Sequence, residues 1–75
     1  MIPKLTDHSF YQTIESASAP TLVGFWSPGC RNCGALLYEL ERLSEEKGKE
    51  IFIYKININE NAKIPAEYQI SDLPA

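Results

Sequence analysis

The chain has 75 residues, of which 44% are hydrophobic and 23% are charged. This length excludes a second domain, and the composition, which is close to that of globular proteins, argues against a disordered chain. Ten acidic residues outnumber seven basic ones, the net charge is −3 and no basic cluster exists, so nothing favours electrostatic binding of nucleic acid or of an anionic membrane. We expect one marginal core, because a chain this short buries only about 60% of its unfolded surface.

Neither a signal peptide nor a membrane span is predicted. The first residues, 1–7, lack the apolar run of a signal peptide, and the uncharged stretch 16–23 is too short and too polar to cross a bilayer. We therefore expect a soluble, cytoplasmic protein. In that compartment a disulfide is more often catalytic than structural.

The first predicted helix begins close to the N-terminus, after a small strand near Leu5. Thr6 or Asp7 is expected to cap this helix, and Ser9 with Gln12 has the spacing of a capping box. Apolar residues then recur at helical intervals, namely Phe10, Ile14 and Ala17. The segment 16–20 ends in a proline and terminates the helix.

A buried strand and a longer amphipathic helix are predicted next. Residues 21–26, Thr-Leu-Val-Gly-Phe-Trp, form the strand, and 27–29, Ser-Pro-Gly, break it. The helix that follows carries an apolar stripe with charged residues opposite, and Gly48 is its expected stop. The stripe consists of Cys33, Leu36, Leu37, Leu40 and Leu43.

The strongest strand signal lies at 51–58, where Lys55 and Asn57 are the only polar residues. A strand that is apolar on both faces is typical of the interior of a parallel sheet with a layer on each side. A turn at 59–61 and a short helix at 62–68 follow. The order of helices and strands predicts an α/β fold built on a βαβ crossover.

The motif Cys30-Arg31-Asn32-Cys33 lies where the first strand gives way to the long helix. We expect Cys30 at the helix N-terminus, where unpaired backbone N–H groups and the helix dipole stabilise a thiolate. Arg31 adds a cation that should lower the pKa of Cys30 further. Cys33, one turn later, faces the leucine stripe and lies close enough to resolve a mixed disulfide. At such a junction in a cytosolic protein, the motif predicts redox chemistry.

Three other interpretations of the cysteines stay open. A structural disulfide closing so short a loop would contribute only about 2 kcal/mol. A zinc site needs four ligands, and His8 is the only other good one, which leaves a Cys₄ site shared between two chains. The thiols could also be buried and inert.

Four segments, 5–10, 23–30, 55–61 and 68–75, carry a resemblance to a known family. Leu-Thr-Asp-x-Ser-Phe begins the chain, Val-Gly-Phe-Trp-Ser-Pro-Gly-Cys leads into the cysteine motif, and Lys-Ile-Asn-Ile-Asn-Glu-Asn ends the last predicted strand. The final segment is Tyr-Gln-Ile-Ser-Asp-Leu-Pro-Ala. These stretches resemble the thioredoxin family, and the whole chain aligns with it by eye without an obvious gap.

The resemblance implies a dithiol–disulfide oxidoreductase with Cys30 as attacking thiolate and Cys33 as resolving thiol. It implies no cofactor besides this redox-active disulfide, protein disulfides as substrates and a reductase as electron donor. It also implies a substrate-contact surface beside the cysteines and two residues that modulate the site. The contact surface comprises Trp26, the Gly29 position, the Leu73 backbone and Pro74 as a cis-proline; the modulating residues are Arg31 and Lys55.

The chain also departs from the family pattern. Gly24 stands where the family has a buried aspartate that helps to deprotonate the resolving thiol, and glycine cannot accept a proton. Lys55 thereby loses its usual partner and is expected to lay its stem along the core. Gly29 replaces a tryptophan of the contact surface. Arg31, with the asparagine after it, replaces Gly-Pro and should make the disulfide more oxidising, while Tyr38 replaces a helix-kinking proline.

The resemblance stops at the cis-proline position, so it implies an incomplete thioredoxin-like fold. We expect a three-stranded core sheet with flanking helices, with the last two strands and the last helix absent. The strand at 21–26 would then form an exposed edge, which favours pairing with another chain. We therefore expect an oxidoreductase whose activity is reduced. The alternative is a non-enzymatic interaction module, or a remnant of a gene, that forms a homodimer through that edge.

Overall fold

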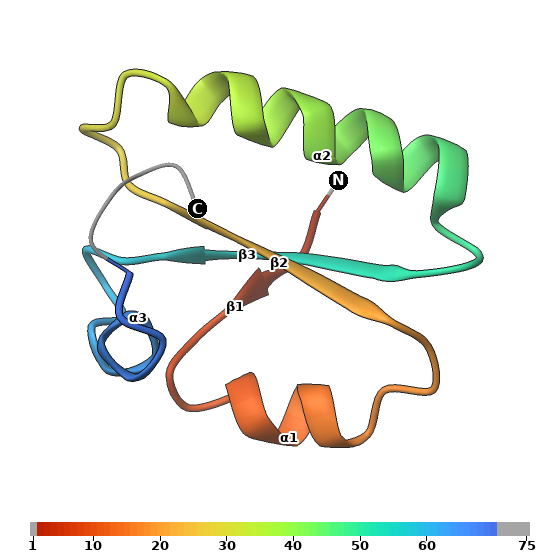
Figure 1. The fold of residues 1–75 in the computed structure, drawn as a ribbon, viewed down its shortest axis with the longest axis horizontal. Coiled ribbons are helices and arrows are strands. Elements are labelled where there is room, and N and C mark those ends of the chain that lie inside the picture. Colours follow the sequence, from red (N-terminus) through yellow and green to blue (C-terminus); the bar gives the residue numbers. More distant parts are fainter. Residues whose placement is uncertain (1, 71–75) are drawn as a thin grey trace.

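The computed structural model describes residues 2–70, which alternate between strands and helices (Figure 1). The elements in chain order are β1 (Lys4–Leu5), α1 (Phe10–Glu15), β2 (Thr21–Trp26), α2 (Cys33–Lys47), β3 (Phe52–Asn57) and α3 (Lys63–Glu67). Both β1 and β2 pair in parallel with β3, so the strand order is β1-β3-β2. The predicted α/β class, the parallel sheet and the βαβ crossover are confirmed.

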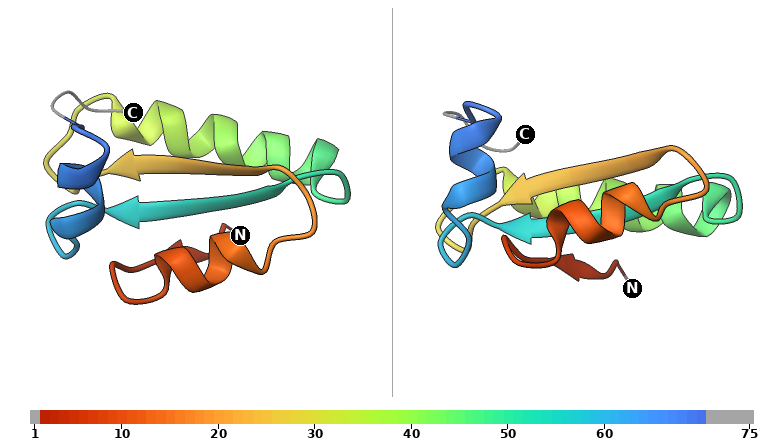
Figure 2. Two further views of the ribbon diagram at one scale, coloured as in Figure 1. Left: turned by 60° about the horizontal axis from the view of Figure 1, so that its bottom comes forward. Right: turned by 90° about the horizontal axis from the view of Figure 1, so that it is seen from below.

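The sheet lies between two helical layers, with α2 on one face and α1 and α3 on the other (Figures 1 and 2). Alternate residues of β3 point to opposite faces, so this one strand contributes to two cores. Ile53 packs with Ile2 and Leu40 beneath α2, and Ile56 is fully buried in the core under α1 and α3. The latter core also contains Leu5, Phe10, Phe25 and Ile64. Apolar residues occur on both faces of the segment 51–58 because β3 is the central strand of the sheet and is covered on both sides.

The helices α1 and α3 are also joined at the surface. The Tyr11 hydroxyl donates a hydrogen bond to Glu67, and this bond raises the pKa of Tyr11 to about 12. In the described part of the chain, no helix is long and apolar enough to cross a membrane.

The predicted cap of the first helix is present at Thr6 but not at Asp7. The Thr6 hydroxyl oxygen accepts a hydrogen bond from the Ser9 backbone N–H at 3.1 Å, and the Ser9 hydroxyl oxygen accepts one from the Thr6 backbone N–H at 3.1 Å, so these two residues cap the turn that leads into α1. Ser9 is the N-cap of α1 itself, and its side chain makes no capping hydrogen bond to the helix, so the predicted capping box of Ser9 with Gln12 does not form.

Asp7 instead caps α3: its two carboxylate oxygens accept hydrogen bonds from the backbone N–H groups of Lys63, at 3.1 Å, and Ile64, at 3.0 Å. Because β1 and β3 are parallel neighbours, the loops that follow them lie side by side. Asp7, in the loop after β1, therefore reaches the N-terminal end of α3, which follows the loop after β3.

Buried Asn61 holds Asp7 in this position. Its side-chain oxygen accepts a hydrogen bond from the Asp7 backbone N–H at 2.9 Å, and its amide donates to the Asn57 carbonyl at 3.1 Å. The three residues thus tie the loop after β1 to the loop after β3. This tie substitutes for an ordinary local cap.

We expect Asp7→Ala to lower the free energy of unfolding by about 1–2 kcal/mol, because it leaves two backbone N–H groups of α3 without their acceptor. Asp7→Asn keeps one acceptor oxygen and should lose about half as much. Urea unfolding followed by circular dichroism measures both. Equal stability of Asp7→Ala and the unmodified chain would show that α3 does not depend on this cap.

Candidate active site

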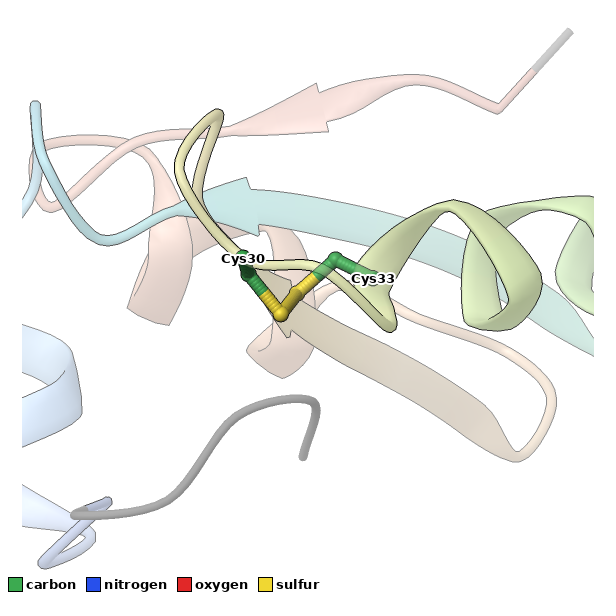
Figure 3. Close-up of a disulfide and its surroundings, with 2 residues drawn as sticks. All are labelled: Cys30 and Cys33. Carbon is green, nitrogen blue, oxygen red and sulfur yellow. A yellow bond between two sulfur atoms is a disulfide. The ribbon is translucent and has the colours of Figure 1, made fainter.

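Cys30 and Cys33 lie beyond the C-terminal end of β2, where the chain turns into α2 (Figure 3). They form a disulfide, with their Cα atoms 5.4 Å apart. A buried strand thus carries the chain to this edge of the sheet, and the helix after it carries the chain back. Two elements of the βαβ unit, β2 and α2, therefore position the two cysteines.

The two sulfur-bearing residues differ in exposure. Cys30 is half-buried, whereas Cys33, the first residue of α2, is only 2% exposed. A substrate sulfur can therefore reach Cys30 before it can reach Cys33. The difference in exposure makes Cys30 the more accessible of the two sulfur-bearing residues.

The position of Cys30 relative to α2 differs from the prediction. The helix begins at Cys33, and Asn32 is its N-cap, with its carbonyl accepting from the Leu36 N–H at 3.4 Å. Cys30 instead ends a turn in which its N–H donates to the Ser27 carbonyl at 3.1 Å. The disulfide joins Cys30 to Cys33, the first residue of α2. The Cys30 sulfur therefore still lies near the N-terminal end of α2, where the helix dipole favours negative charge.

Gly24 is buried in β2 beneath the first half of α2. A Cβ atom at this position would stand 2.6 Å from Leu40 Cδ1 and 3.5 Å from Leu36 Cδ2. Leu40 Cδ1 therefore occupies the space that a side chain at position 24 would need, whereas Leu36 would be in ordinary van der Waals contact with it. Both leucines belong to the apolar stripe of the helix, but the spacing of that stripe does not indicate that Leu40 lies over Gly24.

Lys55 lies opposite Gly24 in the β2–β3 register. Its ammonium nitrogen stands 5.9 Å from the centre of the Trp26 ring, within the range of a cation–π contact. The expectation that Lys55 only extends its stem along the core therefore needs refinement, since its charge lies over an aromatic ring. Trp26 Nε1 is buried and has no hydrogen-bond partner among the described residues.

The other predicted site residues fall into two groups. Gly29 and Arg31 are exposed on the loop that carries Cys30, and a Cβ atom at Gly29 would meet nothing within 4 Å. Leu73 and Pro74 lie outside the described residues. Among residues 2–70, no group of three or more His, Cys, Asp or Glu side chains is placed to hold a metal ion.

Comparison with known proteins identifies what this arrangement is similar to. A family model described as Thioredoxin matches residues 1–75. The chain is 34% identical over 74 residues to a thioredoxin of Rickettsia prowazekii (strain Madrid E), covering 99% of this chain and 70% of the relative. It is 36% identical over 73 residues to a thioredoxin of Pyropia yezoensis, covering 97% of this chain and 68% of the relative.

A solved structure shows the same arrangement of elements. Chloroplastic thioredoxin z superposes on this chain with a TM-score of 0.91 at 27% sequence identity. The match covers 97% of this chain and 65% of that structure's chain. The described sheet and helices thus correspond to about two thirds of the thioredoxin z chain.

Proposed function

This chain belongs to the thioredoxin family, and from that membership we propose that it is a thiol–disulfide oxidoreductase acting through Cys30 and Cys33. The observation that carries the proposal is the disulfide between an accessible Cys30 and a buried Cys33 at the start of α2. Sulfur atoms in a disulfide are not available as thiolate ligands, so this state favours redox chemistry over the Cys₄ metal site shared by two chains.

The proposed reaction transfers two electrons from the reduced chain to a protein disulfide. The Cys30 thiolate attacks one substrate sulfur, forming a mixed disulfide and expelling the other substrate sulfur as a thiolate, which takes up a proton. Cys33 then loses its proton and attacks Cys30 Sγ. The Cys30–Cys33 disulfide forms as the second substrate sulfur leaves. A reductase or a small dithiol donates two electrons and two protons to restore the thiols, and no cofactor takes part.

The proposed contact surface surrounds Cys30. Trp26 and Gly29 lie on the segment that leads to it, and we assign the Leu73 backbone and Pro74 to the same surface from the family resemblance. Arg31, two residues from the helix start, is proposed to stabilise the Cys30 thiolate, and Lys55 to supply positive charge behind Trp26. We further propose a cytoplasmic location, where thiol systems keep such a pair cycling.

Activity should be measurable but lower than that of a thioredoxin with tryptophan before the first cysteine and a buried carboxylate at position 24. The reduced chain is expected to accelerate insulin disulfide reduction by dithiothreitol, read as turbidity of the released B chain. A thioredoxin carrying both groups serves as the reference. A rate equal to dithiothreitol alone would contradict the proposal.

A second candidate function, a non-enzymatic interaction module, draws on one observation. Within residues 2–70, β2 pairs with β3 alone, so its other edge offers backbone groups to a further strand. The two candidates are separable, because the module would act without the thiols.

A further inference from the structure

Arg31 is the charged residue next to the attacking sulfur. The loop between Cys30 and Cys33 leads into α2 (Figure 3), and Arg31 directly follows Cys30 on it. It is the only charged residue in the segment 16–38. Its side chain is exposed and takes part in no ion pair among residues 2–70. A cation in this position is free to pair with a charge that a substrate brings.

The neighbours of Arg31 leave room for a substrate segment. Gly29 and Gly34 flank the motif, and a Cβ atom at either position would meet nothing within 4 Å. Asn32, the N-cap of α2, is exposed as well, and its side chain makes no capping hydrogen bond. Neither glycine therefore screens the guanidinium from a chain that approaches the site.

The other exposed charges at this edge of the sheet nearly cancel. The loop after β3 and the start of α3 contribute Glu60 and Lys63, which are exposed and opposite in sign. Asp7 follows β1, which lies on the far side of β3 from β2, and its carboxylate accepts two hydrogen bonds from α3. Arg31 is thus the charge that a substrate meets beside Cys30.

The geometry of a mixed disulfide determines which substrate residue Arg31 can reach. The Cα atoms of two disulfide-bonded cysteines lie about 5.5–6 Å apart. Arg31 is next to Cys30, and a flanking residue is next to the substrate cysteine. When the two segments run side by side, these two neighbours are therefore also about one disulfide span apart. A guanidinium and a carboxylate that start from such positions can form a charge-assisted hydrogen bond.

We propose that Arg31 selects protein disulfides in which an aspartate or glutamate stands next to the attacked cysteine. This inference rests on the proposed oxidoreductase function and names its substrate class. An acidic neighbour of the substrate disulfide repels the attacking thiolate, and the guanidinium removes that repulsion by pairing with the carboxylate. The chain itself carries a net charge of −3, so the preference is for a carboxylate at this position and not for acidic proteins in general.

Disulfide-linked dimers of the peptide acetyl-Ala-X-Cys-X-Ala-amide test the proposal, with glutamate, glutamine or lysine as X. The rate constant for oxidation of the reduced chain by each peptide is divided by the rate constant of the same peptide with dithiothreitol, which has no neighbouring cation. This ratio removes the intrinsic reactivity of each peptide disulfide. At low ionic strength the ratio for the glutamate peptide should exceed that for the lysine peptide about five-fold, and about 0.5 M salt should reduce the difference.

Variants of Arg31 show whether this residue causes the preference. Arg31→Gln should bring the three ratios together, and Arg31→Glu should reverse their order in favour of the lysine peptide. Both changes also alter the reactivity of Cys30, but that effect is common to all three peptides and leaves their order unchanged. Lys49→Glu is the matched control, because it makes the same change in net charge at an exposed lysine beyond the other end of α2. It should keep the order of the unmodified chain.

The possible outcomes separate this inference from the function on which it rests. Equal ratios for the glutamate and lysine peptides would overturn the selection by Arg31 and leave the oxidoreductase function standing, because all the peptides are reduced. A preference that persists in Arg31→Gln, or that Lys49→Glu abolishes as fully, would likewise exclude this role of Arg31. A chain that reduces no peptide faster than its Cys30→Ser variant would overturn the oxidoreductase function and the inference together.

Discussion

Cys30→Ser is expected to reduce insulin disulfide reduction to the rate of dithiothreitol alone. The side chain that first meets the substrate is lost, and buried Cys33, at 2% exposure, cannot replace it. A serine hydroxyl at this position is not ionised at neutral pH and does not form a bond to sulfur in this exchange. The loss should therefore fall on the first chemical step, whatever the substrate concentration.

Cys33→Ser should give a different result, although it removes the same disulfide. The Cys30 thiolate still attacks, but without the resolving thiol the mixed disulfide accumulates. Non-reducing electrophoresis with mass spectrometry should then show the chain joined to an insulin chain through Cys30. Each variant is the matched control of the other, because both lack the intramolecular disulfide and retain one thiol.

Three measurements together decide the proposed roles. Alkylation by iodoacetamide should label Cys30 faster than Cys33 in the reduced chain, as its greater exposure requires. Equal rates of insulin reduction in Cys30→Ser and the unmodified chain would end the redox proposal. A mixed disulfide that forms through Cys33 in Cys30→Ser would reverse the two roles.

Gly24→Asp should be strongly destabilising, even though it restores a carboxylate that the family carries at this position. Its Cβ atom would meet Leu40 Cδ1 at 2.6 Å, which forces the leucine to move at a cost of about 1–2 kcal/mol. Burial of the carboxylate adds several kcal/mol more, unless Lys55, which lies opposite in the register, leaves Trp26 to pair with it.

Gly24→Ala separates the two costs, because it introduces the same Cβ atom without a charge. The leucine end is flexible, so Gly24→Ala should lose no more than about 1–2 kcal/mol, and the difference between the variants reports the buried carboxylate. Burial raises the pKa of the introduced acid, so the excess loss should diminish as the pH falls below the range where it ionises. Urea unfolding at pH 7 and pH 4 measures both.

The same variant tests the chemistry of the resolving step. If a carboxylate at position 24 helps Cys33 to lose its proton, the folded fraction of Gly24→Asp should release the mixed disulfide faster than Gly24→Ala. This advantage should disappear as the pH falls into the range where the carboxylate is protonated and can no longer accept a proton. Gly24→Asp as stable as Gly24→Ala at pH 7 would show that the Leu36 and Leu40 packing does not keep this position dry.

The sequence alone predicts the order of strands and helices and the proximity of Cys30 and Cys33. The strand at 21–26 was predicted with the bounds that the structure has, and the interior pattern of 51–58 correctly indicated a central parallel strand. These features follow from hydrophobic periodicity and from the position of a Cys-x-x-Cys motif after a strand. Such signals depend on residues close together in the chain, so they can be interpreted without knowledge of any long-range contact.

Only the tertiary structure decided which distant residues meet. Asp7 has the sequence position of a cap for α1 but caps α3, because parallel pairing of β1 and β3 brings their following loops together. In sequence, Gly24 is only a position without a carboxylate, but in the fold Leu40 lies over it. Likewise, the sequence offers Lys55 no partner, whereas the fold places its ammonium group over the Trp26 ring. Each of these contacts depends on strand register and helix placement, which no local pattern encodes.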